Sequence, residues 1–533
     1  MKTTILVSHD RRAMAAGAAA AEAALRAEIS KRGLDKDISV SATGSLGYEA
    51  GGACVLVMPL AVVYTPVTAA DAADIIEAAS KGRALERLAK PVSKSWKMPA
   101  SGSHAEKLAA AQQRVILGNA GVIDPENIGE YVSAGGYGAL AKALAMKPEE
   151  VIAEIKTSEL RGRGGAGFPT ATKWASAAQE KADIKYVVCN ADEGEPGTFK
   201  DREIMEGDPH KLIEGMIIAG YAIGASKGYI YIRGEYALSI SRLEKAAEAA
   251  RAKGFLGEKV LGGNFAFDIE IARGAGAYIC GEESALIESI EGKRGEPRRK
   301  PPYPAQKGLW QKPTVVNNVE TLAAVPHIIL NGGLWHKALG AEGARGTKIF
   351  SIAGDLNWKG VVEIPFGTPV SAIINEIGGG VKGGRKLKAV ILGGVSGSLL
   401  TDSEIATPVD FNSLAKIEAG PGSGAVIVLD ETRSVVEAVL NIARFFKHES
   451  CGRCTPCRAG TAQIVRILEK IRDGKAAEDD ITKLESLARV MAQTSFCPLG
   501  QTAANILSQS LKKFAGEWEA CLCAGCACGG NKK

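Results

Sequence analysis

Four cysteines near the end of the chain constrain its fold most tightly. Cys451, Cys454 and Cys457 form a C-x2-C-x2-C run, and Cys497 follows 40 residues later with Pro498 directly behind it. Three thiolates on one tight loop and a remote fourth form the ligand pattern of a single [4Fe–4S] cluster. Structural zinc is the alternative, although zinc sites usually take two separated cysteine pairs. The spacing therefore predicts a cluster, and with it one-electron transfer.

The remaining cysteines are unevenly spread, because eight of the eleven follow residue 450. The first residues form no signal-peptide core, so we expect a cytoplasmic chain whose cysteines bind metal rather than pair as disulfides. Four belong to a short tail, residues 516–533: Cys521, Cys523, Cys526 and Cys528. Metal binding and a reduced, disordered tail are both open for these four. Cys54, Cys189 and Cys280 lie in apolar strands and are expected to be ordinary buried side chains.

The composition excludes several classes of protein. With 65 Lys and Arg against 60 Asp and Glu, the 533-residue chain carries a net charge of +5, too little for a nucleic-acid-binding surface. The longest apolar stretch, 54–64, is too short to cross a bilayer and contains Pro59. We therefore expect no nucleic-acid partner and no direct membrane insertion. An apolar fraction of 46% rules out disorder as the main state.

Periodicity and composition predict a multidomain α/β protein. The predicted units are 1–88, a small α/β domain; 89–105, a linker rich in Pro, Ser and Lys; 106–340, the largest domain, which holds most glycine clusters; 345–430, a β-rich domain; 431–515, a helical domain; and 516–533, the tail. In the first unit we expect a strand at 2–8, one helix over 14–32 and a strand pair broken at Pro59. Short strands are expected at 348–353, 360–364, 387–392 and 424–429, and helices at 431–447 and 460–473.

A glycine loop at 162–167, GRGGAG, matches the pattern G-x-G-x-x-G. A dinucleotide fingerprint needs a strand immediately before it, but the preceding residues have a helical pattern, so we reject that interpretation. Backbone N–H groups of glycine-rich turns also bind anions, and Arg161, Arg163 and Lys173 add positive charge. A purely structural turn is the alternative.

Four further segments place polar side chains after apolar stretches. A strand-like run at 186–189 leads into Asn190, Asp192, Glu193 and Glu195. Ligand-binding loops commonly follow the carboxyl ends of strands in α/β sheets, although a solvated acidic turn is the simpler interpretation of any one such loop. The other three segments contain Gly281, Glu282 and Glu283; Lys300 and Tyr303; and Asn317, Asn318 and Thr321. Together they suit a bulky polar cofactor.

In order, these segments resemble the NADH-oxidising flavoprotein subunit of respiratory complex I and its soluble relatives. The similar stretches, spread over residues 150 to 515, are RGRGGAGFPT, NADEGEPGTFKDR, GAGAYICGEE, KPPYPA, PTVVNNVET and ESCGRCTPCR. The resemblance implies FMN, NAD(H) and a [4Fe–4S] cluster as cofactors. It also implies a Rossmann-like FMN and NADH domain, a β-grasp-like domain and a helical bundle that carries the cluster. Because hydride passes to FMN, no catalytic side chain is expected.

The resemblance also implies roles for individual residues. Those expected around the FMN phosphate and ring are Gly162, Arg163, Gly164, Gly165, Lys173, Asn190, Asp192, Glu193, Gly281, Asn317, Asn318 and Thr321. Phe168 and Tyr303 should flank the adenine, with Lys300 nearby. No second stacking aromatic is evident beyond Trp174, and Ser176 is the position where we expect that contact. The acids expected in the nucleotide pocket are Glu195, Glu282 and Glu283. An acidic lining repels the 2′-phosphate of NADPH, so NADH is the expected nucleotide.

The first 88 residues resemble the thioredoxin-like [2Fe–2S] domain of partner subunits. The positions that align with its four cysteine ligands are Ser8, Ala13, Ser45 and Glu49, and none is cysteine. We expect a domain that has lost its cluster and serves in docking. Such a fused domain is typical of the β subunit of soluble NAD-linked formate dehydrogenases that contain molybdenum or tungsten.

The resemblance therefore predicts a diaphorase subunit of a soluble dehydrogenase complex. Formate dehydrogenase is the complex that it favours most. The expected partners are the iron–sulfur and catalytic subunits, including a [2Fe–2S] thioredoxin-like subunit. The same role in a NAD-linked hydrogenase, an electron-bifurcating complex or complex I is the alternative within this class. A scaffold subunit with a dead flavin site is the alternative of another class.

Overall fold

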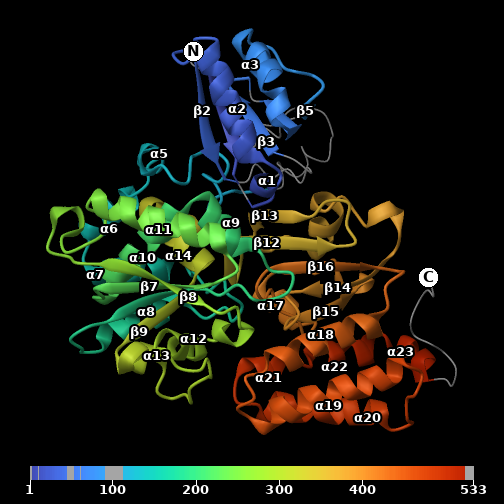
Figure 1. The fold of residues 1–533 in the computed structure, drawn as a ribbon. Coiled ribbons are helices and arrows are strands. Elements are labelled where there is room, and N and C mark those ends of the chain that lie inside the picture. Colours follow the sequence, from blue (N-terminus) through green and yellow to red (C-terminus); the bar gives the residue numbers. More distant parts are fainter. Residues whose placement is uncertain (1–2, 10, 45–52, 61, 91–111, 523–533) are drawn as a thin grey trace.

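The computed structural model describes residues 3–9, 11–44, 53–60, 62–90 and 112–522 (Figure 1). It is a mixed α/β structure in which three larger sheets and a carboxyl-terminal group of helices follow one another along the chain. The predicted α/β class is confirmed. In the described part, no helix is long and apolar enough to cross a membrane.

The first sheet has the strand order β2-β1-β3-β4-β5, with β1 and β2 parallel and the other neighbours antiparallel. Its strands are β1 (Thr3–Ser8), β2 (Ile38–Thr43), β3 (Ala53–Met58), β4 (Val62–Val67) and β5 (Ala89–Lys90). The strand pair breaks at Pro59 as predicted. The helix expected over 14–32 is instead two helices, α1 (Arg11–Ala15) and α2 (Ala18–Lys31), because Gly17 takes a φ of 92° between them. Ala89 and Lys90 belong to this sheet, not to the predicted linker.

The second sheet is entirely parallel, in the order β8-β7-β6-β9. Its strands are β6 (Tyr186–Ala191), β7 (Lys227–Arg233), β8 (Asp268–Gly274) and β9 (Thr314–Asn318). Val187 and Cys189 face one apolar core, while Tyr186 and Val188 face another, so both sides are covered. The chain runs outward from β6 to β8 and then returns to the other side of β6 at β9. This reversal of strand order opens a crevice at the carboxyl ends of β6 and β9, where α/β sheets bind ligands.

Two long helices pack closely together on one side of this sheet. They are α10 (Pro209–Ile223) and α14 (Val319–Asn331), and nearly every residue of both is buried. Gly215 of α10 lies so near Leu322 that an added Cβ would be 2.1 Å from the Leu322 carbonyl oxygen. The contact fixes α14, whose first turn follows directly from β9.

The third sheet has the order β13-β12-β16-β14-β15. Its strands are β12 (Thr347–Gly354), β13 (Gly360–Pro365), β14 (Leu387–Leu392), β15 (Ser398–Thr401) and β16 (Ala425–Asp430). The four predicted strands are confirmed to within one or two residues at each end. β15 was not predicted, because four residues behind the glycine-rich run 393–397 give too short a pattern to read.

The last helices enclose a second core with the back of the parallel sheet. They are α18 (Val435–Glu449), α19 (Thr455–Arg472), α20 (Asp480–Thr494), α21 (Pro498–Thr502), α22 (Asn505–Lys513) and α23 (Ala515–Leu522). α18 begins later than predicted because Ser434 caps it, accepting a hydrogen bond from the Glu437 N–H. α19 begins earlier, since Pro456 fits its first turn. The start of the predicted tail is helical, as α23, and the residues beyond Leu522 lie outside the described part.

Two histidines buried in the helical layer make stability depend on pH. His210 on α10 is buried, and so is the Nε2 atom of His327 on α14. This burial lowers the pKa of His210 to about 4 and that of His327 to about 3. An unfolded histidine titrates near a pKa of about 6.5, so below that pH the unfolded chain binds more protons than the folded one.

These two histidines should contribute a fall in the free energy of unfolding from about pH 6.5 toward pH 4, measurable as urea midpoints at several pH values. His327→Gln should flatten this dependence, whereas His448→Gln, at an exposed position, should leave it unchanged. If the free energy of unfolding changes equally with pH in the wild type and in His327→Gln, His327 does not cause the dependence.

Candidate functional site

A cavity of about 1080 Å³ opens at the carboxyl ends of β6 and β9, and we call it the flavin cavity. Its volume exceeds the range of roughly 300–1,000 Å³ usual for one small ligand. The predicted site residues that line it are Gly162, Gly164, Gly165, Phe168, Lys173, Asn190, Asp192, Glu193, Glu195, Gly281, Glu282, Glu283, Lys300, Tyr303, Asn317 and Asn318. Ser176 also lines it. Residues that are scattered over 157 positions of the sequence thus meet in one space.

Arg163 and Thr321 were predicted at the flavin but do not line the cavity. The buried Arg163 guanidinium lies 4.7 Å from the centre of the Phe366 ring and donates to the carbonyl oxygens of Arg161 and Arg345. It therefore ties the glycine loop to the third sheet instead of facing a ligand. Thr321 is fully buried, and its hydroxyl accepts the Arg163 backbone N–H at 2.8 Å. Both act behind the cavity wall.

The glycine loop follows a helix, α7 (Pro148–Thr157), as predicted, and leads into α8 (Thr170–Gln179). Gly164 packs against Asn318 so closely that an added Cβ would lie 3.0 Å from the Asn318 Cβ. Gly165 has a φ of 135°, which L-residues rarely adopt. Because these two glycines carry no side chain, the backbone itself forms the cavity wall here, which leaves room for a planar or phosphorylated ligand.

At one side of the cavity, acids and lysines alternate. Lys300 Nζ lies 2.8 Å from Glu282 Oε1 and 2.8 Å from Glu283 Oε1, and Lys173 Nζ lies 3.0 Å from Glu283 Oε2. Burial opposes ionisation of Glu283, but the two lysines hold its pKa below the usual value. Phe168 and Tyr303 are 51% and 55% exposed, which is unusual for such large apolar rings. Exposed rings beside ion pairs suit the stacking of an aromatic base.

Asp192, directly after β6, has an unpartnered oxygen. Its Oδ2 is buried and has no hydrogen-bond partner among the described residues, while Asn190 accepts the Asp192 backbone N–H at 3.1 Å. Burial raises the pKa of Asp192 to about 7. Buried polar atoms are rarely left without a partner, so this oxygen fits an N–H donor from a bound ligand. A flavin ring carries such a donor, and the residues present therefore fit FMN.

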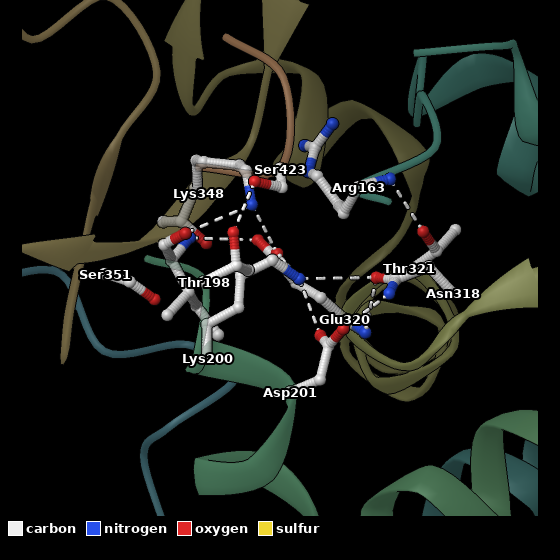
Figure 2. A network of polar contacts seen from close by, with 12 residues as sticks. Arg163, Thr198, Lys200, Asp201, Asn318, Glu320, Thr321, Lys348, Ser351 and Ser423 are labelled. Carbon is white, nitrogen blue, oxygen red and sulfur yellow. Dashed lines mark hydrogen bonds and ion pairs between the residues drawn. The ribbon is translucent and has the colours of Figure 1, made fainter. Parts of the chain in front are cut away.

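Glu193 lines the cavity, but its carboxylate is hydrogen-bonded to other residues of the protein. Its carboxylate accepts the backbone N–H groups of Lys200 and Asp201, at 2.9 and 2.8 Å, and the Tyr236 hydroxyl at 3.0 Å. Burial and the nearby Asp201 charge raise its pKa to about 7. Its main effect in this structure is to hold the start of α9 (Lys200–Gly207), which carries part of a polar network below the cavity (Figure 2).

Sequence reasoning missed the part of the cavity wall that comes from other domains. Two loops of the third sheet, 393–398 and 418–423, line it, as do Pro498, Leu499, Thr502 and Asn505 around α21. The signal for the loops was their composition, GGVSGS and EAGPGS, since close backbone approach needs glycine. Trp174 does not contact a ligand in the cavity, because it is buried and donates through Nε1 to Asn317.

The four cysteines predicted to hold the cluster line one small cavity. Cys451 and Cys454 precede α19, Cys457 lies in its first turn, and Cys497 comes just before α21. All four are free. Burial raises the pKa of Cys497 to about 11, opposed by hydrogen bonds from two backbone N–H groups at the start of α21. Four thiols around one space form the donor set of a [4Fe–4S] cluster, so the residues present fit it.

Ile279 and Leu499 line both the cysteine cavity and the flavin cavity. The two spaces are therefore separated by a wall one side chain thick. Tyr278 strengthens the same boundary, because its backbone N–H donates to Glu449, two residues before Cys451, and its hydroxyl donates to Glu195. Groups bound in the flavin cavity and in the cysteine cavity would be separated by this wall alone.

Comparison with known proteins identifies the chain. Residues 155–327 match the Nuo51 FMN-binding domain, and residues 437–521 match the NADH-ubiquinone oxidoreductase-F iron–sulfur binding region. The chain is 51% identical over 393 residues to a NADH-quinone oxidoreductase subunit of Aquifex aeolicus, covering 74% of this chain and 91% of that protein. It belongs to the NADH-binding flavoprotein subunits of NADH-quinone oxidoreductases and related hydrogenases. This family member is an oxidoreductase subunit that holds FMN and a [4Fe–4S] cluster.

Other relatives of this flavoprotein subunit are hydrogenase components. It is 49% identical over 409 residues to the NADP-reducing hydrogenase subunit HndC of Solidesulfovibrio fructosivorans, covering 77% of this chain and 83% of that one. A solved structure of a NAD⁺-reducing [NiFe]-hydrogenase in the H₂-reduced state matches with a TM-score of 0.69 and 35% identity. That match covers 98% of this chain and 84% of the solved chain, so it reaches the amino-terminal domain.

Several other predicted positions can now be placed. Cys54, Cys189 and Cys280 are buried, as predicted, although Cys280 lies in a short 3-10 helix (Tyr278–Gly281) and not in a strand. Cys521 is buried on α23. Cys523, Cys526 and Cys528 lie outside the described residues. Of the four positions aligned with [2Fe–2S] ligands, Ser8 and Ala13 are buried, and Ser45 and Glu49 fall outside the described part.

Proposed function

We propose that this flavoprotein is the diaphorase subunit of a NAD-linked dehydrogenase complex. It would exchange hydride with NAD(H) at FMN and pass single electrons through its cluster to partner subunits. Bound FMN supplies the chemistry that converts an electron pair into single electrons. The observation that carries the proposal is the wall of Ile279 and Leu499, which the flavin cavity and the cysteine cavity share.

The side chains of this subunit position the ligands. Phe168 and Tyr303 offer exposed rings to the adenine, and the Lys300 ion pairs hold that end of the cavity open. Asp192 accepts a hydrogen bond from the flavin. No general base is required, because the hydride moves directly between nicotinamide and flavin.

The second substrate is supplied by partner subunits. Formate is the substrate that we propose first, on the resemblance of the fused amino-terminal domain to that of formate dehydrogenase β subunits. A NAD-linked hydrogenase is the second candidate, and the match of a hydrogenase chain across 98% of this one favours it. We propose a cytoplasmic complex in which a thioredoxin-like amino-terminal domain docks the iron–sulfur partners. The third sheet and last helices serve as the proposed β-grasp-like and cluster-binding domains.

The test is an anaerobic visible spectrum of the purified protein before and after addition of NADH. Bleaching of the flavin band, followed by loss of the broad iron–sulfur absorbance, is expected. A protein purified from its own host without flavin or iron would favour the scaffold alternative. Adding formate or hydrogen to the isolated complex, with NAD⁺ present, then distinguishes the two second substrates.

The choice of nucleotide gives a further prediction. Glu195 forms no ion pair with lysine or arginine among the described residues. Its carboxylate accepts hydrogen bonds from the Tyr278 hydroxyl, from the hydroxyl and backbone N–H of Ser396, and from the Val395 backbone N–H. Burial raises its pKa, and those hydrogen bonds oppose the shift. Its uncompensated charge should repel the 2′-phosphate of NADPH more than the paired Glu282 and Glu283 do.

Glu195→Gln is expected to raise the NADPH-to-NADH ratio of kcat/KM about tenfold. Steady-state kinetics with both nucleotides measures it. Glu244→Gln, which removes an exposed acid paired with Arg273, is the matched control and should leave the ratio unchanged. If Glu195→Gln leaves the NADPH-to-NADH ratio of kcat/KM unchanged, other acids in the pocket discriminate between the two nucleotides.

A further inference from the structure

A buried group of charges adjoins the flavin cavity, and Figure 2 shows its members, Lys200, Asp201, Glu320 and Lys348. Lys200 and Asp201 begin α9, Glu320 lies in the first turn of α14, and Lys348 lies on β12. The four side chains are between 0 and 3% exposed. Such charges are costly to bury unless they are paired, so their pairing decides what this group does.

Two lysines share one carboxylate oxygen in this group. Lys200 Nζ lies 2.8 Å from Glu320 Oε2, and Lys348 Nζ lies 2.5 Å from the same oxygen. Lys200 also pairs with Asp201 Oδ1 at 2.6 Å. The other oxygen of Glu320 accepts the backbone N–H of Ile349 at 2.9 Å. Within these four side chains, two positive and two negative charges balance, and Lys348 is the cation contributed by the third sheet. Arg163 also acts electrostatically on Glu320, and Glu193 on Lys200.

The group is continuous with the cavity wall. Lys200, Asp201 and Asn318 line the flavin cavity, but Glu320 and Lys348 do not. Asn318 donates through Nδ2 to Asp201 at 2.7 Å, and its Oδ1 accepts the Glu320 backbone N–H at 3.0 Å. A change in the charge on Glu320 therefore acts directly on Lys200 and, through Lys200, on Asp201, and both of these residues line the cavity.

The pKa values of the two lysines are shifted in opposite directions. Burial disfavours the charge on Lys200, but Asp201 and Glu320 outweigh it and raise its pKa. Burial lowers the pKa of Lys348 to about 7, although Glu320 opposes the shift. Lys200 is thus the fixed cation at the cavity wall, and Lys348 is the weaker one behind it.

We propose that Lys348 is a positioning residue for the flavin site. It neutralises Glu320 from the third sheet, so that Lys200 keeps its place at the cavity wall and no excess negative charge lies below the ligand. FMN brings a phosphate anion, and reduction adds electrons, so both binding and reduction favour a balanced group over a negative one. The inference rests on the proposed function only in taking FMN as the occupant.

The test uses full-length protein stripped of flavin. The FMN dissociation constant is measured by the quenching of flavin fluorescence, and the flavin midpoint potential is measured by dye titration of the reloaded protein. Below pH 7, where Lys348 is protonated, K348M leaves one excess negative charge, so at pH 6 we expect the dissociation constant to rise about tenfold and the potential to become more negative. K388M removes a different ion pair of the third sheet, with Glu517, and should change neither quantity.

The double variant E320Q/K348M separates charge from structure. It removes one negative and one positive charge, so it should return the potential toward the wild-type value, which a mere packing defect would not do. A folded K348M with unchanged potential and FMN affinity overturns the inference, as does a double variant that stays as negative as K348M. If K348M does not fold, E320Q alone should have a more positive potential than E320Q/K348M, and equal values overturn the inference.

The wild-type control keeps this inference apart from the proposed function. Wild-type protein that binds no FMN, or whose bound FMN is not reduced by NADH, rejects the proposed function. Wild-type protein that binds and reduces FMN, beside a K348M variant with unchanged properties, rejects only the role of Lys348.

Discussion

Cys454→Ser is expected to leave the reduction of flavin by NADH intact and to abolish electron transfer to partner subunits. Cys454 lines the cysteine cavity with three other thiols, and serine is a much poorer ligand for iron than a thiolate. The flavin cavity lies on the far side of Ile279 and Leu499, so loss of the cluster should not disturb hydride transfer. Rapid mixing with NADH should show flavin bleaching at the wild-type rate, within about twofold, and no slower iron–sulfur phase.

Cys54→Ala is the matched control for this experiment. Cys54 is a buried cysteine on β3 of the amino-terminal sheet, where its thiol donates to the Thr65 hydroxyl, and it lines neither cavity. The variant should retain both phases and the full iron content. Onward electron flow that survived in Cys454→Ser would mean that this thiol is not a cluster ligand, whatever the spacing of the cysteines implies.

The cysteine site could be predicted from sequence because its ligands are few and three of them are neighbours. A C-x2-C-x2-C run fixes three thiolates on one loop, and only the distant Cys497 depends on the fold. The turn into α21 brings it back, with backbone N–H groups directed at its sulfur. Local spacing and ligand chemistry therefore carried this prediction almost alone.

The flavin cavity could be predicted only in part. Residues after β6 and β9 lie where strand order reverses, which chain order and strand pattern indicate. The side-chain direction of Arg163 was beyond such reasoning, because its partners Arg345 and Phe366 come from a different domain. The loops at 393–398 and 418–423 were missed for the same reason. Contacts between domains produce no periodic pattern of apolar residues in the sequence, so they cannot be predicted from it.

Asp192→Ala is expected to weaken FMN binding by about tenfold to a hundredfold and to stabilise the flavin-free protein. The buried Asp192 Oδ2 has no partner among the described residues, so the empty protein carries an unsatisfied acceptor that the flavin satisfies. Removing the carboxylate removes both that cost and the contact. The alanine leaves space that opens into the flavin cavity, so no sealed void offsets the gain.

The pH dependence of that stabilisation identifies its cause. Burial raises the pKa of Asp192 to about 7 in the folded protein, whereas an unfolded aspartate titrates near a pKa of about 3.9. Between these values the folded state binds more protons, so the carboxylate reduces stability as pH rises toward 7. The advantage of flavin-free Asp192→Ala over wild type should grow from about pH 4 to pH 7 by up to about 3 kcal/mol, then level off.

Denaturant unfolding of flavin-free protein at several pH values measures this difference, and fluorescence titration measures FMN binding. Asp183→Ala, which removes an exposed acid paired with Lys312, should show neither effect. A stabilisation that is independent of pH would mean that the alanine acts through packing, and unchanged FMN binding would remove Asp192 from the flavin site. The combination of weaker binding with a more stable empty protein is the signature of a carboxylate held in place for its ligand, because a side chain that merely supports the fold would lose both together.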